Sequence, residues 1–222
     1  MEANWNVEIE YKHVERFEPG SSESVAYLDQ HGYVILKETL TKKEAEKTLK
    51  LLWDYLEDLG TGIDRNNPST WGDDRWPTSA HGGILPSYGI GHSESQWFLR
   101  SVPNVKKAFA KIWGTEELLT SFDGVSLWRP WNIDPSWKTE SGQSWFHIDQ
   151  HPITRPGKQC IQGLVNLLPT SKEIGGNVVV PGSHRFFENI PSEYKERLAK
   201  LPLGIDHFRF PNDDPKLSSE KP

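Results

Sequence analysis

His147 and Asp149 are the two side chains whose types and spacing best suit metal chemistry in this sequence. They flank Ile148 in an apolar stretch, and successive side chains of an extended strand point to opposite faces. We therefore expect the imidazole and the carboxylate to project to one side and Ile148 to the other. Such a pair supplies two ligands of the 2-His-1-carboxylate triad, which leaves positions open on Fe(II) for a co-substrate and dioxygen.

The His-x-Asp pattern is only three residues long, so the neighbouring sequence decides how strongly it indicates a metal site. On its own, it more often marks two ordinary surface side chains with unrelated hydrogen bonds. Here the aromatic residues Trp145 and Phe146 precede it, and the turn-forming Pro152 follows. An apolar run over residues 160–168 comes next, and residues 175–185 then read Gly-Gly-Asn-Val-Val-Val-Pro-Gly-Ser-His-Arg.

These motifs, in this order, resemble the phytanoyl-CoA dioxygenase family of Fe(II)/2-oxoglutarate oxygenases. The resemblance covers about residues 30–210, and its specific motifs lie in the last third of the chain. It implies that His147, Asp149 and a distal His hold Fe(II), and that 2-oxoglutarate binds to the iron. It also implies that decarboxylation of 2-oxoglutarate to succinate accompanies hydroxylation of a small organic substrate by dioxygen. The fold does not select that substrate.

The third iron ligand is harder to assign. His184 lies in the Pro-Gly-Ser-His turn, which in the family is a structural feature at the edge of the pocket. In the family, the distal His lies on a later strand. An Arg about ten residues farther on binds the 2-oxoglutarate carboxylate through its planar fork. His207 is followed by Arg209 after only two residues. We expect the distal ligand to be absent, with His184 and His207 as weaker candidates.

Three other histidines are poorer ligand candidates. His151 is too close to Asp149 to complete a facial array and is expected to support the site or a loop. His81 and His92 have no liganding neighbour at strand or helix spacing.

Trp128, Gln162 and Asn166 lie on neighbouring predicted strands and are candidates for binding the co-substrate. Ordinary core packing is the alternative interpretation for all three.

A helix is predicted over residues 41–59. Thr41 and Glu44 have the spacing of a capping box, and Gly60 closes the helix. The apolar face of this helix comprises Ala45, Leu49, Leu52, Leu56 and Leu59. Residues 61–92 lose this periodicity, and such a long loop is a candidate lid over the site.

The remaining elements change from helices to strands along the chain. Helices are expected over residues 94–100 and 103–113, and later over residues 191–200 with Ser192 as a cap. Apolar, β-branched runs predict five strands in addition to an early one over residues 32–37, namely 118–130, 144–149, 160–168, 177–180 and 207–210.

This order favours a mainly β protein with N-terminal helices (α+β), namely a double-stranded β-helix or cupin-like jelly roll. We expect one domain over residues 1–222, with a helical buttress at about 41–114, jelly-roll strands at about 118–210 and a polar tail at 211–222. About five strands are too few for a complete jelly roll, so the C-terminal part of the barrel is expected to be missing.

Composition excludes several classes of protein. The net charge of -6 and the absence of a Lys/Arg cluster argue against nucleic-acid binding. Cys160 is the only cysteine, so no disulfide framework is expected, and no apolar run is long enough to span a membrane. We expect a cytoplasmic protein.

Two alternatives to the oxygenase remain. The chain could be an incompetent fragment or a non-catalytic jelly-roll binding protein, or it could be a cupin-like zinc or iron enzyme that does not use 2-oxoglutarate. Metal titration and succinate formation separate the three.

Overall fold

The computed structural model describes residues 14–80, 83–138, 146–170, 177–202 and 204–211, together with residue 214. Several predictions concern residues outside these ranges. They are those for His81, for Trp145, for the Gly-Gly pair at 175–176 and for most of the polar tail.

The described elements are mostly short. The α-helices are α1 (Ser22–His31), α2 (Lys42–Asp58), α3 (Glu94–Ser101), α4 (Pro103–Trp113), α5 (Ile190–Glu193) and α6 (Lys195–Leu198). The strands are β1 (Arg16–Phe17), β2 (Ile35–Leu36), β3 (Ile84–Leu85), β4 (Val125–Ser126), β5 (His147–Ile148) and β6 (Phe208–Arg209). Turns of 3-10 helix are η1 (Pro68–Thr70), η2 (Ile90–His92), η3 (Pro135–Trp137) and η4 (Ser183–Asn189).

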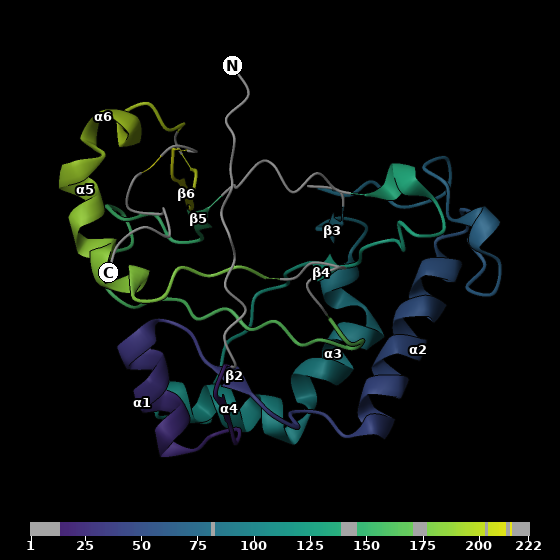
Figure 1. Ribbon diagram of the computed structural model, residues 1–222, viewed down its shortest axis with the longest axis horizontal. Helices are drawn as coiled ribbons and strands as arrows, with labels where there is room; N and C mark the ends of the chain where they lie inside the picture. The colour runs from purple at the N-terminus through teal and green to yellow at the C-terminus, as the bar shows by residue number, and fades with distance from the viewer. Residues whose placement is uncertain are drawn as a thin grey trace.

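The four longest helices lie along one side of the molecule (Figure 1). Helix α1 packs on α4, and α2 packs on α3. The β5–β6 pair lies at the other side, flanked by α5 and α6, while β3 and β4 lie above α3 in this view. No helix of the described part is both long and apolar enough to cross a membrane.

Helix α2 confirms the predicted capping box. The Thr41 side chain accepts a hydrogen bond from the Glu44 backbone N–H at 3.3 Å, and the Thr41 N–H donates to Glu44 Oε2 at 2.8 Å. Its buried residues are Thr48, Leu52 and Leu56. Thr48 was not expected in the apolar face. It is tolerated because its hydroxyl donates to the Glu44 carbonyl within the helix at 2.7 Å.

The described segments 61–80 and 83–92 contribute four residues to the core, so the loop expected as a candidate lid is packed against α2. A first core cluster joins this segment to α2 and consists of Leu52, Leu56, Ile63, Trp76, Leu85 and Ile90. The apolar side chains are spaced irregularly in sequence, so helical or strand periodicity does not reveal them. Burial of this many large side chains fixes the segment against the helix.

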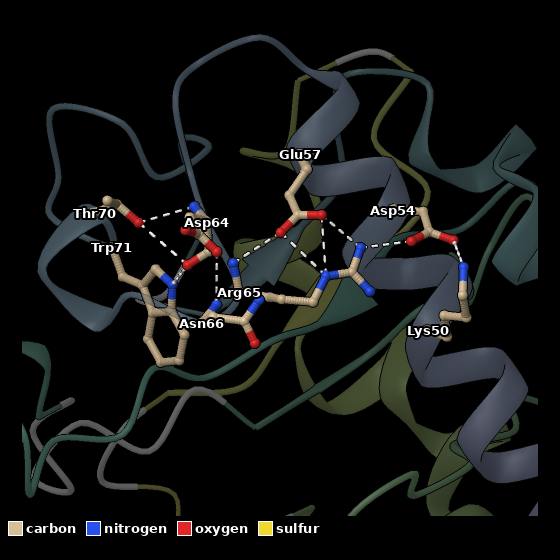
Figure 2. Close-up of polar contacts among 8 residues, drawn as sticks. All are labelled: Lys50, Asp54, Glu57, Asp64, Arg65, Asn66, Thr70 and Trp71. Carbon is tan, nitrogen blue, oxygen red and sulfur yellow. Dashed lines mark hydrogen bonds and ion pairs between the residues drawn. The ribbon is translucent and has the colours of Figure 1, made fainter.

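Arg65 adds polar contacts to this packing (Figure 2). Its Nε lies 3.1 and 3.0 Å from the two carboxylate oxygens of Glu57, and its Nη2 lies 2.5 Å from Asp54 Oδ1. Both carboxylates belong to α2. A planar guanidinium suits this arrangement because its donors form a rigid fork.

The strands pair as three two-stranded ladders, with β1–β2 parallel and β3–β4 and β5–β6 antiparallel. The predicted strands at 118–130 and 207–210 shorten to β4 and β6, and the described part of the predicted strand at 144–149 contains β5. Residues 160–168 and 177–180 form no strand. A β-like sequence needs a hydrogen-bonded neighbour to become a strand, and these two segments have none within the described residues. The jelly roll stays a prediction.

The C-terminal helical prediction needs a second correction. The single helix expected over 191–200 is two short helices, α5 and α6, broken at Tyr194. Ser192 lies inside α5, where its hydroxyl donates to the Asn189 carbonyl at 2.9 Å, so it is not a cap. A second core cluster, consisting of Ile190, Leu198 and Phe208, joins these helices to β6.

Candidate metal centre

The β5–β6 ladder separates an apolar face from a polar one. Ile148 of β5 pairs with Phe208 of β6, which is fully buried, and Ile148 packs against the second core cluster. Because side chains alternate along a strand, His147 and Asp149 project from the opposite face. This is the arrangement expected from the sequence.

The two polar side chains converge. His147 Nε2 lies 3.2 Å from Asp149 Oδ1, and the two side chains are 26% and 41% exposed. Two ligands bound at right angles to one octahedral ion at about 2.1 Å lie about 3.0 Å apart. The pair therefore fits two neighbouring positions on one metal ion, and an imidazole nitrogen with a carboxylate oxygen is a donor set that suits iron.

Asp149 is held in its ionised form. The hydrogen bond with His147 is the main reason that the pKa of Asp149 lies below its ordinary value. The amide of Gln162, which donates to Asp149 Oδ2, and the charge of His207 lower this pKa further, while partial burial opposes them. A metal ligand must be deprotonated to bind, and this environment keeps Asp149 ionised to a lower pH than an ordinary Asp.

His207 and Arg209 face this pair from β6. The register places Arg209 opposite His147, and its continuation places His207 opposite Asp149. The described contact of His207 is with its neighbour Asp206, whose Oδ1 lies 3.9 Å from His207 Nδ1. Arg209 is exposed. Within the described ranges, no three His, Cys, Asp or Glu side chains form a group that could hold a metal ion.

His184 contacts α1 instead of the His147–Asp149 pair. Its Nε2 lies 3.0 Å from the Asp29 carbonyl oxygen. In the same turn, the Gly182 N–H donates to the His31 carbonyl at 2.7 Å and Arg185 Nη2 donates to the Gln30 carbonyl at 2.8 Å. The last carbonyls of a helix have no partner within the helix. The Pro-Gly-Ser-His-Arg turn therefore caps α1.

The other candidates fall in different places. Gln162 is brought to Asp149, whereas Asn166 Nδ2 contacts Thr170 Oγ1 at 3.4 Å. The Trp128 ring lies against Gly83, beside the β3–β4 ladder. None of the described contacts of Trp128 or Asn166 joins them to the His147–Asp149 pair.

Two histidines have structural contacts. His92 lies against the Phe122 ring, with centroids 4.0 Å apart. His151 Nδ1 accepts hydrogen bonds from the Ile153 and Thr154 N–H groups, each at 3.2 Å, and so shapes the turn after β5. This agrees with the loop role expected for His151.

Gln150 has a role that the sequence did not reveal. Its Nε2 donates to the carbonyls of Arg155 and Gly157 at 2.5 and 2.6 Å, and its Oε1 accepts from the Gln159 N–H at 3.3 Å. Gln150 thus folds back the loop that follows Asp149. The one sequence feature that pointed to Gln150 is that it directly follows the His-x-Asp pattern.

Comparison with known proteins gives two relatives. The chain is 30% identical over 197 residues to "Ava biosynthesis cluster protein O" of Aspergillus versicolor, covering 86% of this chain and 61% of that protein. It is 25% identical over 216 residues to "Putative phytanoyl-CoA dioxygenase" of Dictyostelium discoideum, covering 81% of this chain and 60% of that protein. The chain thus spans about three fifths of the length of these curated relatives. No family model and no solved structure matches it.

Proposed function

We propose that this chain is part of an Fe(II)- and 2-oxoglutarate-dependent dioxygenase that hydroxylates a small organic substrate. His147 and Asp149 are two of its iron ligands. The observation that carries the proposal is their convergence on one face of β5, with Nε2 and Oδ1 3.2 Å apart. The name of the relative from Dictyostelium discoideum supports the same class of enzyme.

His147 and Asp149 contribute differently to metal binding. His147 supplies a neutral nitrogen donor, and Asp149 supplies a negative charge that partly neutralises the metal. When bound, Fe(II) and 2-oxoglutarate supply the oxidative decarboxylation that yields succinate and CO2 and is coupled to hydroxylation of a C–H bond. The proposed scaffold is a double-stranded β-helix, of which the β5–β6 ladder is one part.

The proposal assigns no role as ligand to His184, because its ring contacts the end of α1. His207 is the better placed of the two remaining histidine candidates, since it lies beside β5. Comparing the Fe(II) affinities of His207→Ala and His184→Ala therefore tests which histidine, if either, is the third ligand.

Anaerobic titration of the chain with Fe(II) and 2-oxoglutarate tests the function. If the third iron ligand lies within this chain, we expect a charge-transfer absorption that His147→Ala abolishes and that His184→Ala, a matched control of the same residue type, leaves unchanged. Exposure to air with 2-oxoglutarate is then expected to produce succinate.

Other results contradict the proposal in different ways. Metal binding without succinate indicates a non-catalytic binding protein or an enzyme that does not use 2-oxoglutarate. If neither the wild-type chain nor His147→Ala binds Fe(II), the assignment of His147 and Asp149 as ligands is wrong.

A further inference from the structure

Each carboxylate oxygen of Asp149 has a different partner. Oδ1 faces His147 Nε2, whereas Oδ2 accepts a hydrogen bond from the side-chain amide of Gln162. Gln162 lies 13 residues farther along the chain, in the segment 160–168. The two oxygens are therefore not equivalent.

The backbone beside Gln162 is anchored by packing. Gly163 lies so close to the Phe109 ring of α4 that a Cβ at this position would be 2.9 Å from the ring. Farther along the segment, Leu167 packs against the first core cluster. The amide of Gln162 is thus held by a segment that is fixed at two points.

A carboxylate without such a partner has more freedom. Its terminal torsion is broad, and its two oxygens can bind one cation together or singly. A donor on Oδ2 restricts both freedoms, because rotation would break the hydrogen bond and the amide occupies one of the two lone pairs of Oδ2. Oδ1, which faces His147, is then the more accessible oxygen for a metal ion.

We infer that Gln162 is a positioning residue that holds Asp149 so that only Oδ1 binds the metal. This inference rests on the proposed function, since it requires His147 and Asp149 to be ligands. Hydrogen-bond partners of metal ligands typically change metal affinity by about 10- to 100-fold when they are removed.

Metal binding by the whole chain tests the inference without measuring activity. The probe is Co(II), titrated by calorimetry and by its visible absorption, which reports the number of ligands around the ion. We expect Gln162→Met, which keeps the length of the side chain but has no N–H donor, to weaken binding about tenfold or more. Its absorption is expected to change as Asp149 becomes free to chelate.

Two further variants separate positioning from general damage. Gln159→Met alters the same residue type nearby, where the side chain donates to the Pro156 carbonyl at 2.9 Å, and is expected to bind Co(II) as the wild type does. Gln162→Glu has nearly the same shape but presents a carboxylate that cannot donate to Asp149, so its Co(II) absorption should change as that of Gln162→Met does. Because Gln162 is exposed, all three variants are expected to keep the thermal midpoint of the metal-free chain.

Different results overturn the inference alone or the inference together with the proposed function. If the wild type binds Co(II), His147→Ala does not, and Gln162→Met matches the wild type in affinity and absorption, the inference is overturned while the proposed function stands. If the wild type binds no Co(II), both are overturned. Equal losses in Gln162→Met and Gln159→Met also overturn it, because they show a general effect of the loop.

Discussion

Gly32 is the residue on which the contact between α1 and His184 depends most directly. It ends α1 with a left-handed backbone, at a φ of 78°. A Cβ at this position would lie 2.3 Å from His184 Nδ1. Only glycine combines this backbone conformation with the close approach of the imidazole ring.

Substitution of Gly32 by alanine therefore has two costs. We expect Gly32→Ala to lower the free energy of unfolding by about 1 kcal/mol for the backbone, and by about 1 to 3 kcal/mol more for displacing the ring. Gly114→Ala is the matched control, because Gly114 ends α4 at a φ of 68° with no atom within 4 Å of the added Cβ. Urea denaturation measures both. Equal losses in the two variants would show that His184 does not pack tightly on α1.

At the same level, the sequence predicted that His147 and Asp149 lie together, but not that Gln162 contacts Asp149. Alternation along a strand is a local rule, so the common face of His147 and Asp149 follows from their spacing. Gln162 reaches Asp149 only because a later segment folds back, and no local rule specifies that contact. The Pro-Gly-Ser-His turn was expected to be structural, but its contacts with α1 were not predicted, for the same reason.

Among the elements, α2 and the segment packed on it are joined by a pH-dependent contact. Hydrogen bonds from Arg65 hold the pKa of Glu57 below its ordinary value. Lys50 and, secondarily, Arg65 lower the pKa of Asp54 in the same way. A carboxylate whose pKa is lower in the folded chain stabilises the fold above its unfolded pKa, and this stabilisation is lost as the pH falls through the folded value.

We therefore expect the thermal midpoint of the chain to fall as the pH drops below about 4.5, the region where free carboxylates titrate. Arg65→Met removes the common partner of Glu57 and Asp54, so the midpoint of this variant should be lower at pH 7 and should fall less steeply in acid. Arg75→Met is the control, because Arg75 forms an exposed ion pair with Asp74 at 3.5 Å. Parallel acid profiles for wild type and Arg65→Met would contradict the expected contribution of this contact.

The helices and strands also show which parts of the fold can be predicted from local sequence patterns. Helix α2 was predicted with its capping box because both the apolar spacing and the cap are local. The segment 61–92 was not, since its burial depends on Trp76, Leu85 and Ile90 meeting α2. The segments 160–168 and 177–180 have the composition of strands, but composition does not provide the neighbouring strand that pairing requires.

Across the whole molecule, the two core clusters have different relations to the His147–Asp149 pair. The first contains Leu56 of α2, whereas the second contains Phe208 and supports β5 through Ile148. Damage to the second cluster should therefore reach His147 and Asp149, and damage to the first should not.

Paired truncations test this difference. Leu56→Ala and Phe208→Ala are each expected to lower the free energy of unfolding by about 3 to 5 kcal/mol, because both side chains are fully buried. At a temperature where both variants are folded, only Phe208→Ala should also weaken Co(II) binding. Denaturant unfolding and Co(II) titration provide the two measurements, and equal affinities in the two variants would show that β6 does not support the pair.

The cap on α1 has a consequence for the order of events during synthesis. His184 and the helix carbonyl that it contacts are 155 residues apart in the chain. At translation rates of about 5 to 20 residues per second, the capping turn is synthesised roughly 8 to 30 s after α1. Throughout that interval the carbonyls of Asp29, Gln30 and His31 lack these partners, and a helix of ten residues on its own is only marginally stable in water.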